Sequence, residues 1–241
     1  MKNLLKVFVL ATIVAPAVLI MTACVGQVHG AGSVVSHDFE VSNFNGVRIS
    51  GGYVVNFEYS AEPSVSVEMQ ENLFEHLRVQ VRDNILHIDS KKNFVTTLTN
   101  TPHINISAPN LNSLDFRGAV KTGEWDKIEA QHFTIKTSGS SDIVMSFEVD
   151  QLDITTAGSA RLTLSGSAPV TKIKLSGSAK ILALNLQTAD IDIRASGSCS
   201  ADIACSTKLN VVISGAGLVR YSGSPTVTQK ISGSGKIQPI G

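Results

Sequence analysis

A short motif centred on glycine recurs along the second half of this chain at a nearly constant spacing. Its copies are Ser138-Gly139-Ser140, Ala157-Gly158-Ser159, Ser176-Gly177-Ser178, Ser196-Gly197-Ser198, Ser214-Gly215-Ala216 and Ser232-Gly233-Ser234. Successive glycines are 19, 19, 20, 18 and 18 residues apart, and Arg117-Gly118-Ala119 extends the series backwards by 21 residues. A period near twenty residues is typical of a solenoid, in which each repeat buries its apolar face against its neighbours.

Apolar residues hold fixed positions relative to these glycines. Four residues after a glycine stand Ile143, Leu162, Ile181, Ala201, Val219 and Ile237. Four residues before a glycine stand Ile135, Ile154, Ile173, Ile193 and Val211, with Gln229 as the last member. Because side chains alternate between the two faces of a strand, these columns predict one strand that ends at each glycine and another that begins there. The sequence therefore predicts an all-β, parallel β-solenoid with coils of 18–21 residues and two or three strands per coil.

The repeat glycines are expected to mark corners, because glycine tolerates positive φ and lets the backbones of adjacent coils approach closely. These residues are Gly118, Gly139, Gly158, Gly177, Gly197, Gly215 and Gly233, and Gly166 and Gly223 suggest a second corner. The flanking serines could form a ligand surface or a glycosylation track, but we favour a role in supporting the turns.

The first 23 residues read as a secretory signal. Lys2 and Lys6 precede an apolar run over residues 7–20, and Met21-Thr22-Ala23 follows the run and places the small Ala23 directly before Cys24. This order resembles the bacterial lipobox, so we predict a lipoprotein signal peptide over residues 1–23, a diacylglyceryl group on Cys24 and a flexible tether over residues 24–36. The alternative is an ordinary signal peptide cut near residues 28–31. Val25-Gly26, directly after Cys24, lacks the Asp that holds some lipoproteins at the inner membrane, which favours the outer membrane if the host has one.

The remainder is expected to form one continuous domain with two portions. Residues 37–110 form an N-terminal β portion of short strands, and residues 111–241 form the Ser-Gly-Ser repeat. In the first portion, Glu71–His76 predicts one helical turn, and Asp83-Asn84 predicts a two-residue hairpin turn. Residues 50–52 suggest a tight glycine turn between two strands.

Charge and cysteine content restrict the partners. Without the signal peptide the chain carries 18 basic and 20 acidic side chains, and this balance argues against nucleic acid. Cys199 and Cys205 are separated by roughly 20 Å of extended chain, so we expect two buried thiols and not a disulfide. No spacing of histidine, cysteine or carboxylate residues indicates a metal or a cofactor.

One column of charged residues could serve an enzyme. Asp142, Arg161 and Lys180 each stand three residues after a repeat glycine, which predicts one outward face on consecutive coils. Asp190 and Asp192 share a strand face at about 6.6 Å, within the separation that glycoside hydrolases use. We interpret both sets as solvated surface, because the column mixes signs and no aromatic platform for sugars accompanies the carboxylates.

Several segments together resemble the bacterial family described as putative auto-transporter adhesin, head GIN domain. They are Phe44-Asn45-Gly46-Val47 with Ser50-Gly51-Gly52, Asn84-Ile85-Leu86-His87-Ile88, residues 104–111 and the Ser-Gly-Ser repeats. The resemblance spans roughly residues 40–238, and it implies a right-handed parallel β-helix on a secreted or lipid-anchored envelope protein. It brings no catalytic residues.

These observations lead to one functional hypothesis and two alternatives. We expect a non-enzymatic, lipid-anchored envelope protein that binds a polysaccharide or a protein along the outward faces of its coils. The first alternative is a polysaccharide lyase or glycoside hydrolase on a pectate-lyase-like helix. The second is a structural component that assembles with copies of itself.

Overall fold

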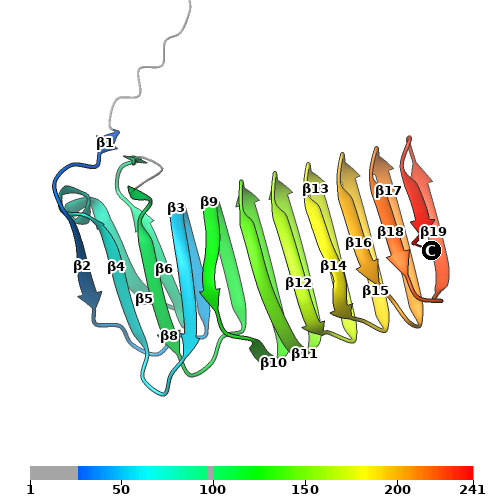
Figure 1. Cartoon of the computed structure of the whole chain (residues 1–241), viewed down its shortest axis with the longest axis horizontal. Coiled ribbons are helices and arrows are strands. Elements are labelled where there is room, and N and C mark those ends of the chain that lie inside the picture. Colours follow the sequence, from blue (N-terminus) through cyan, green and yellow to red (C-terminus); the bar gives the residue numbers. More distant parts are fainter. Residues whose placement is uncertain (1–26, 97–99, 241) are drawn as a thin grey trace, which may run out of the picture.

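Successive repeats stack as parallel strands (Figure 1). Each repeat glycine lies against the glycine of the coil before it. The computed structural model describes residues 27–96 and 100–240 and is a β-solenoid of about seven turns. The all-β solenoid predicted from the repeat is confirmed.

Two sheets run along the solenoid. The pre-glycine sheet contains the strands that end at the repeat glycines, namely β10 (Ile128–Gly139), β13 (Val170–Gly177), β15 (Asp190–Gly197), β17 (Lys208–Gly215) and β19 (Thr226–Ser232). The post-glycine sheet contains β12 (Arg161–Ser167), β14 (Lys180–Gln187), β16 (Ser200–Ala204), β18 (Leu218–Ser222) and β20 (Lys236–Pro239). Three long strands continue from one sheet into the other: β3 (Gly46–Tyr59), β9 (Ser113–Trp125) and β11 (Asp142–Gly158). Each coil from residue 142 to residue 232 thus contributes two strand segments.

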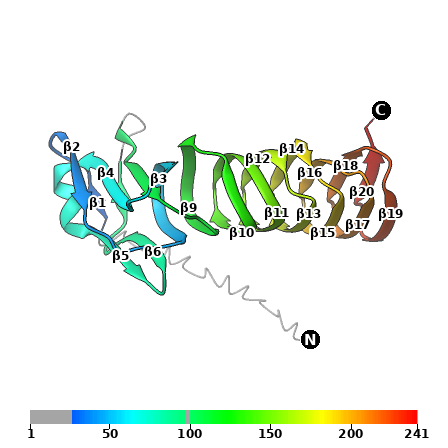
Figure 2. The same cartoon turned by 90° about the horizontal axis from the view of Figure 1, so that it is seen from below.

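The N-terminal portion extends both sheets beyond β3. In the pre-glycine sheet, β6 (Ile85–Ser90) pairs in parallel with the first half of β3, and β5 (Leu77–Arg82) pairs antiparallel with β6. In the post-glycine sheet, β8 (His103–Ala108) pairs in parallel with the second half of β3. Two antiparallel strands follow it, β4 (Ser64–Gln70) and then β2 (Val34–Phe39). A two-residue pair, β1 (Val28–His29) with β7 (Phe94–Val95), lies at the same end (Figure 2).

The core lies between the two sheets and consists of the predicted apolar columns. Four residues after the glycines, Ile143, Leu162 and Ile181 are each 0% exposed. The column four residues before the glycines is equally buried until its last member, Gln229, which is exposed. Burial of this apolar surface, at about 25 cal/mol per Å², supplies the main driving force for stacking.

Two local predictions in the N-terminal portion are confirmed. Glu71–His76 forms the 3-10 helix η1, whose Leu73 is fully buried. Asp83 and Asn84 form the turn between β5 and β6 with φ of 52° and 59°, the left-handed values that a two-residue hairpin turn requires.

Two other expectations need correction. Residues 50–52 do not separate two strands, because β3 runs through them and Gly51 pairs in parallel with Gly118 as the first member of the glycine column. Residues 34–36, expected to belong to a flexible tether, lie in β2, because their backbone pairs with β4. The predicted signal peptide over residues 1–23 and the lipid site Cys24 lie outside the described residues.

The repeat glycines all have positive φ, between 86° and 121°. At Gly139, an added β carbon would stand 2.5 Å from the carbonyl oxygen of Gly118. Only glycine fits such a corner, because a side chain would meet both the backbone strain and the neighbouring coil.

Candidate functional site

The outer face of the pre-glycine sheet carries ionic side chains in aligned columns. The alternation that turns isoleucine and leucine inward turns the intervening residues outward. Lys172 of β13 pairs with Asp192 of β15, which pairs with Asn210 of β17. Two residues further along the strands, Lys174 pairs with Arg194. Parallel stacking therefore gathers into one face residues that lie 18–20 positions apart in the chain.

This face is hollowed into a shallow groove over β13, β15 and β17. One part, about 420 Å³ in volume, is lined by Val170, Thr171, Lys172, Asp190, Ile191, Asp192, Lys208, Asn210 and Thr228. A second part, also about 420 Å³, shares Lys172 and Asp192 and adds Ile173, Lys174 and Arg194. Because the two parts share residues, we treat them as one feature and call it the β13–β17 groove.

One carboxylate of the groove has partners within the protein. The amide Nδ2 of Asn210 donates a 2.8 Å hydrogen bond to Asp192 Oδ2, and Arg194 Nε lies 3.4 Å from Asp192 Oδ1. Lys172, Lys174 and Lys208 are exposed, and none has an ion-pair partner within 4.0 Å among the described residues. The groove therefore presents three ammonium groups that remain available to a ligand.

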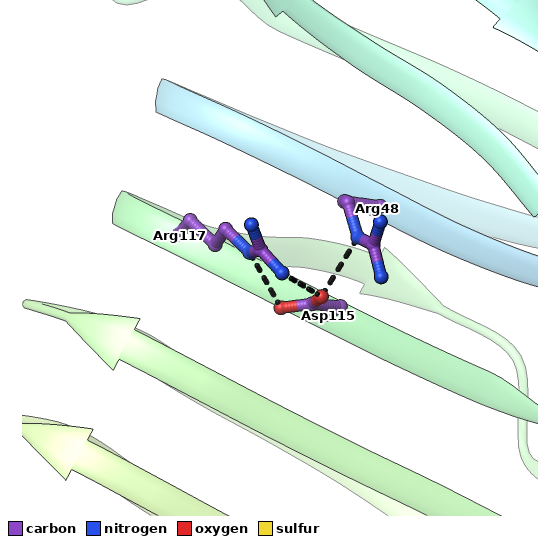
Figure 3. A network of polar contacts seen from close by, with 3 residues as sticks. All are labelled: Arg48, Asp115 and Arg117. Carbon is purple, nitrogen blue, oxygen red and sulfur yellow. Dashed lines mark hydrogen bonds and ion pairs between the residues drawn. The ribbon is translucent and has the colours of Figure 1, made fainter.

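Arginines on the same face nearer the N-terminus are not available in this way. Arg48 of β3 and Arg117 of β9 both bind Asp115, through Nε at 2.8 Å and Nη2 at 2.7 Å respectively (Figure 3). Burial would raise the pKa of Asp115, but the hydrogen bonds from Arg117 and Arg48 outweigh it and hold the pKa below its ordinary value. This cluster joins the first two coils of the stack, and each of its arginines already holds a carboxylate.

The charged column predicted from sequence lies on the other sheet. Asp142 pairs with Arg161, and Arg161 pairs with Lys180, so the three residues do stack on consecutive coils of the post-glycine sheet. Asp142 and Arg161 are exposed, Lys180 is half-buried, and none of them lines the β13–β17 groove. These charged side chains therefore follow one another along an open surface and do not converge on a pocket.

A second groove of about 310 Å³ lies at the acidic N-terminal end of the post-glycine sheet. Its centre is a chain of amides, in which Asn56 Nδ2 donates to Asn105 Oδ1 at 2.7 Å and Asn105 Nδ2 donates to Ser66 Oγ at 3.2 Å. Three carboxylates surround it, those of Asp38, Glu58 and Glu124. Within residues 27–96 and 100–240, no three His, Cys, Asp or Glu side chains lie close enough together to hold a metal ion.

The β13–β17 groove was missed by reasoning from the sequence. The sequence indicates Asp190 and Asp192 as a pair of carboxylates on one strand face, without their lysine neighbours. The neighbours could have been found by writing the coils one above another and reading the third, fifth and seventh residues before each glycine. What no sequence pattern supplies is the pairing of Asp192 with Asn210 and Arg194, which leaves the lysines free.

Comparisons with known proteins agree on family and fold. The family model described as "Putative auto-transporter adhesin, head GIN domain" matches residues 43–225. A crystal structure of a putative adhesin from Bacteroides fragilis NCTC 9343 is 22% identical, with a TM-score of 0.79 over 88% of this chain and 100% of that one.

Two further crystal structures, both from Parabacteroides distasonis ATCC 8503, each cover 89% of this chain and 100% of their own. One is a putative adhesin, with 21% identity and a TM-score of 0.69, and the other is a putative lipid binding protein, with 19% identity and a TM-score of 0.66. At these identities the structures show a shared fold. No curated protein matches the chain, and no helix of the described residues is long and apolar enough to cross a membrane.

Proposed function

Because this chain belongs to the family of putative auto-transporter adhesins with a head GIN domain, we propose that it is a lipid-anchored adhesion protein of the cell envelope. In this proposal it binds an extended polysaccharide or protein ligand along the outer face of the pre-glycine sheet. The contact is made by the β13–β17 groove and by neighbouring coils of the same face.

The observation that carries this proposal is the set of unpaired lysines in the groove. A lysine that already pairs with a carboxylate of its own protein gives up part of that interaction when it binds an anionic ligand. Lys172, Lys174 and Lys208 have no carboxylate partner among the described residues, so they give up none. Adjacent coils repeat at about 4.8 Å, so a linear ligand lying along the stack meets a new row of side chains at each coil. Many such weak contacts add up when one ligand spans several coils.

The proposal assigns no catalysis to this face. An enzyme of the pectate-lyase-like type would need carboxylates and cations that converge on one bond, with a general acid or base in reach of it. Here Asp192 is held by Asn210 and Arg194, and the column from Asp142 to Lys180 runs along an open surface of the other sheet. Incubation with a panel of polysaccharides should therefore release no shortened or unsaturated products.

Attachment to the envelope is the second part of the proposal. The expected lipid site, Cys24, precedes Gln27, the first described residue, by three positions. β1 and β2 lie at the end of the solenoid opposite to β19 (Figures 1 and 2). An anchor at Cys24 would hold that end near the membrane and leave the coils from β13 to β19 further away, where an external ligand can reach them.

A binding screen on the mature chain tests the adhesion proposal. We expect binding to one class of glycan or matrix protein on an array. The double substitution Lys172→Glu with Lys208→Glu should abolish that binding. As a matched control, Arg161→Glu with Lys180→Glu makes the same change of charge on the other sheet and should leave binding intact. If only the control variant lost binding, the contact would lie on the post-glycine sheet. If neither variant lost binding, the lysines of the β13–β17 groove would not carry the contact.

Self-assembly is a second candidate function, favoured by the last coil. Ile231 of β19 is 39% exposed, whereas Ile213, which pairs with it one coil earlier, is 1% exposed. Among the described residues, β19 pairs only with β17 and β20 only with β18. Unpaired strand edges of this kind can recruit another chain. Sedimentation of the mature chain over a range of concentrations decides this: a monomer throughout would reject assembly through this edge.

A further inference from the structure

Charge is divided unevenly along the solenoid, although the chain as a whole is close to neutral. Residues 27–158 carry 9 basic and 17 acidic side chains, a formal net charge of −8. Residues 159–240 carry 9 basic and only 3 acidic side chains, a formal net charge of +6. The near-neutral total hides two segments of opposite sign.

In a solenoid this division along the sequence is also a division in space. Each coil contacts only its neighbours, so the order of the coils along the axis follows the order in the chain (Figures 1 and 2). Seven steps separate Gly51 from Gly233, or about 34 Å at 4.8 Å per coil. This exceeds the Debye length of about 8 Å at physiological ionic strength, so each end presents its own sign to a partner.

The positive end also contains a cluster of cations that have no ion-pair partner among the described residues. Lys172, Lys174 and Lys208 line the β13–β17 groove, and Lys230 continues the same outward face on β19. At the negative end, by contrast, Arg48 and Arg117 of this face share the single carboxylate of Asp115, and the exposed Lys136 lies next to Asp115 in register. The field of the segment and the local geometry therefore favour the same kind of ligand, one that is negatively charged and extended.

We propose that the coils from residue 159 to residue 240 bind a linear anionic polysaccharide, one that carries carboxylate groups, in the β13–β17 groove. This inference rests on the proposed adhesion function and names the ligand class of the same face. The lysine ammonium groups bind the carboxylates of successive sugars. The side chains of Asn210, Thr228 and Asp190 supply hydrogen bonds to the hydroxyl groups between them.

The composition of the groove favours a polysaccharide over a nucleic acid. A duplex carries one negative charge per about 1.7 Å, and Asp190 and Asp192 in the middle of the groove would repel so dense a charge. The groove lining contains no aromatic side chain on which a base could stack. Anionic sugars, with wider charge spacing and hydroxyl groups between the charges, suit a mixture of lysines, amides and isolated carboxylates.

The test compares three polymers on the intact mature chain. Polygalacturonate is the anionic probe, dextran of matched length is the neutral probe, and duplex DNA is the probe for any dense polyanion. We expect polygalacturonate to bind, dextran to bind at least tenfold more weakly, and DNA to compete poorly. Binding should weaken steeply as the salt concentration rises, because the contacts are between exposed charges.

Two triple substitutions separate the groove from overall charge. Lys172→Gln, Lys174→Gln and Lys208→Gln together should lower the affinity for polygalacturonate by about tenfold or more. Lys91→Gln, Lys92→Gln and Lys127→Gln remove the same charge from the negative end and should change it by less than twofold. All six lysines are exposed, so both variants should fold, which circular dichroism checks.

The outcomes distinguish failure of the ligand class from failure of the adhesion proposal. Equal binding of dextran, equal competition by DNA, or an unchanged affinity in the groove variant would reject the anionic polysaccharide and leave adhesion to another ligand. Binding to no glycan or protein would reject both proposals. Salt-sensitive association of the chain with itself, without polysaccharide binding, would mean that the negative end of a second copy occupies the positive face.

Discussion

Gly158 lies directly against Gly139 of the preceding coil: a β carbon on Gly158 would stand 2.5 Å from the carbonyl oxygen of Gly139. The two residues pair in register between β10 and β11. Both have φ of 112°, a value that other residues rarely adopt. The corner of the solenoid is therefore built from backbone packed on backbone.

Substitution of Gly158 by alanine should destabilise the protein by at least about 2 kcal/mol, because it adds both backbone strain and a clash with the neighbouring coil. Denaturant unfolding followed by circular dichroism measures this change. The matched control is Ser159→Ala at the next, exposed position, which should stay within about 0.5 kcal/mol of the wild type. Equal stability of the two variants would show that the corner tolerates a side chain.

Substitution of an inward-facing residue should destabilise the protein less in the last described coil than in the coil before it. Ile213 and Ile231 occupy the same inward position on adjacent strands, but they are 1% and 39% exposed. Ile213→Ala should cost about 2–5 kcal/mol, the usual range for a buried isoleucine, whereas Ile231→Ala should cost less than about 1 kcal/mol. Similar costs at both positions would mean that Ile231 is covered in solution, as the self-assembly alternative requires.

The Asp115 cluster should make stability depend on pH. The folded state lowers the pKa of Asp115 below the ordinary value of 3.8. Its stabilisation is therefore fully present above about pH 4 and is lost as the pH falls through the lower pKa of the folded state. Asp115→Asn should cost about 1 kcal/mol at pH 7, since both arginines are partly exposed, and the difference from the wild type should shrink as the pH falls through the lower pKa of the folded state. A cost that does not change with pH would argue against an ionic origin.

Cys199 and Cys205 should be reduced and unreactive in the folded protein. Each is free and 2% exposed, and burial raises the pKa of both thiols. Since the thiolate is the reactive form, a thiol reagent at neutral pH should label neither residue in the native state and both after unfolding. Mass spectrometry without a reductant should find no disulfide between them. Rapid labelling of the native protein would show that the coil around them opens.

The anchor prediction is tested at Cys24. We expect the wild-type protein to partition with membranes and to carry the mass of a diacylglyceryl group after cleavage. Cys24→Ala should abolish both properties without changing the fold of the purified protein, because residue 24 precedes the described strands. Unchanged membrane partitioning and unchanged mature mass would reject the lipid anchor in favour of an ordinary signal peptide.

Much of the fold could be predicted because its rules are local or periodic. The glycine spacing and the apolar columns define coils in which residue i stacks near residue i + 19, and the buried Ile154 and Ile173 pair as that spacing predicts. The turn at Asp83-Asn84 follows from the dipeptide alone, since both residues tolerate the left-handed conformation.

Gly51 shows where periodicity stops being informative. It belongs to the glycine column, but 67 positions separate it from Gly118, and the intervening chain includes β4, η1, β5, β6, β7 and β8. No repeat spacing survives so long an insertion. The strand pairing that joins the two glycines depends on how the insertion packs at the end of the solenoid.

The candidate site divides in the same way. The period of two along each strand predicts that ionic residues alternate with buried ones, and the coil spacing predicts that they align into outward columns. Which of these charges form pairs depends on how the coils pack in space. Asp115 forms an ion pair with Arg48 of another strand. Asp192 accepts a hydrogen bond from Asn210 and pairs with Arg194. Lys172 and Lys208 have no ion-pair partner among the described residues. Burial follows from a period of two along each strand, whereas the pairing of side chains depends on distances between coils that no pattern within one strand encodes.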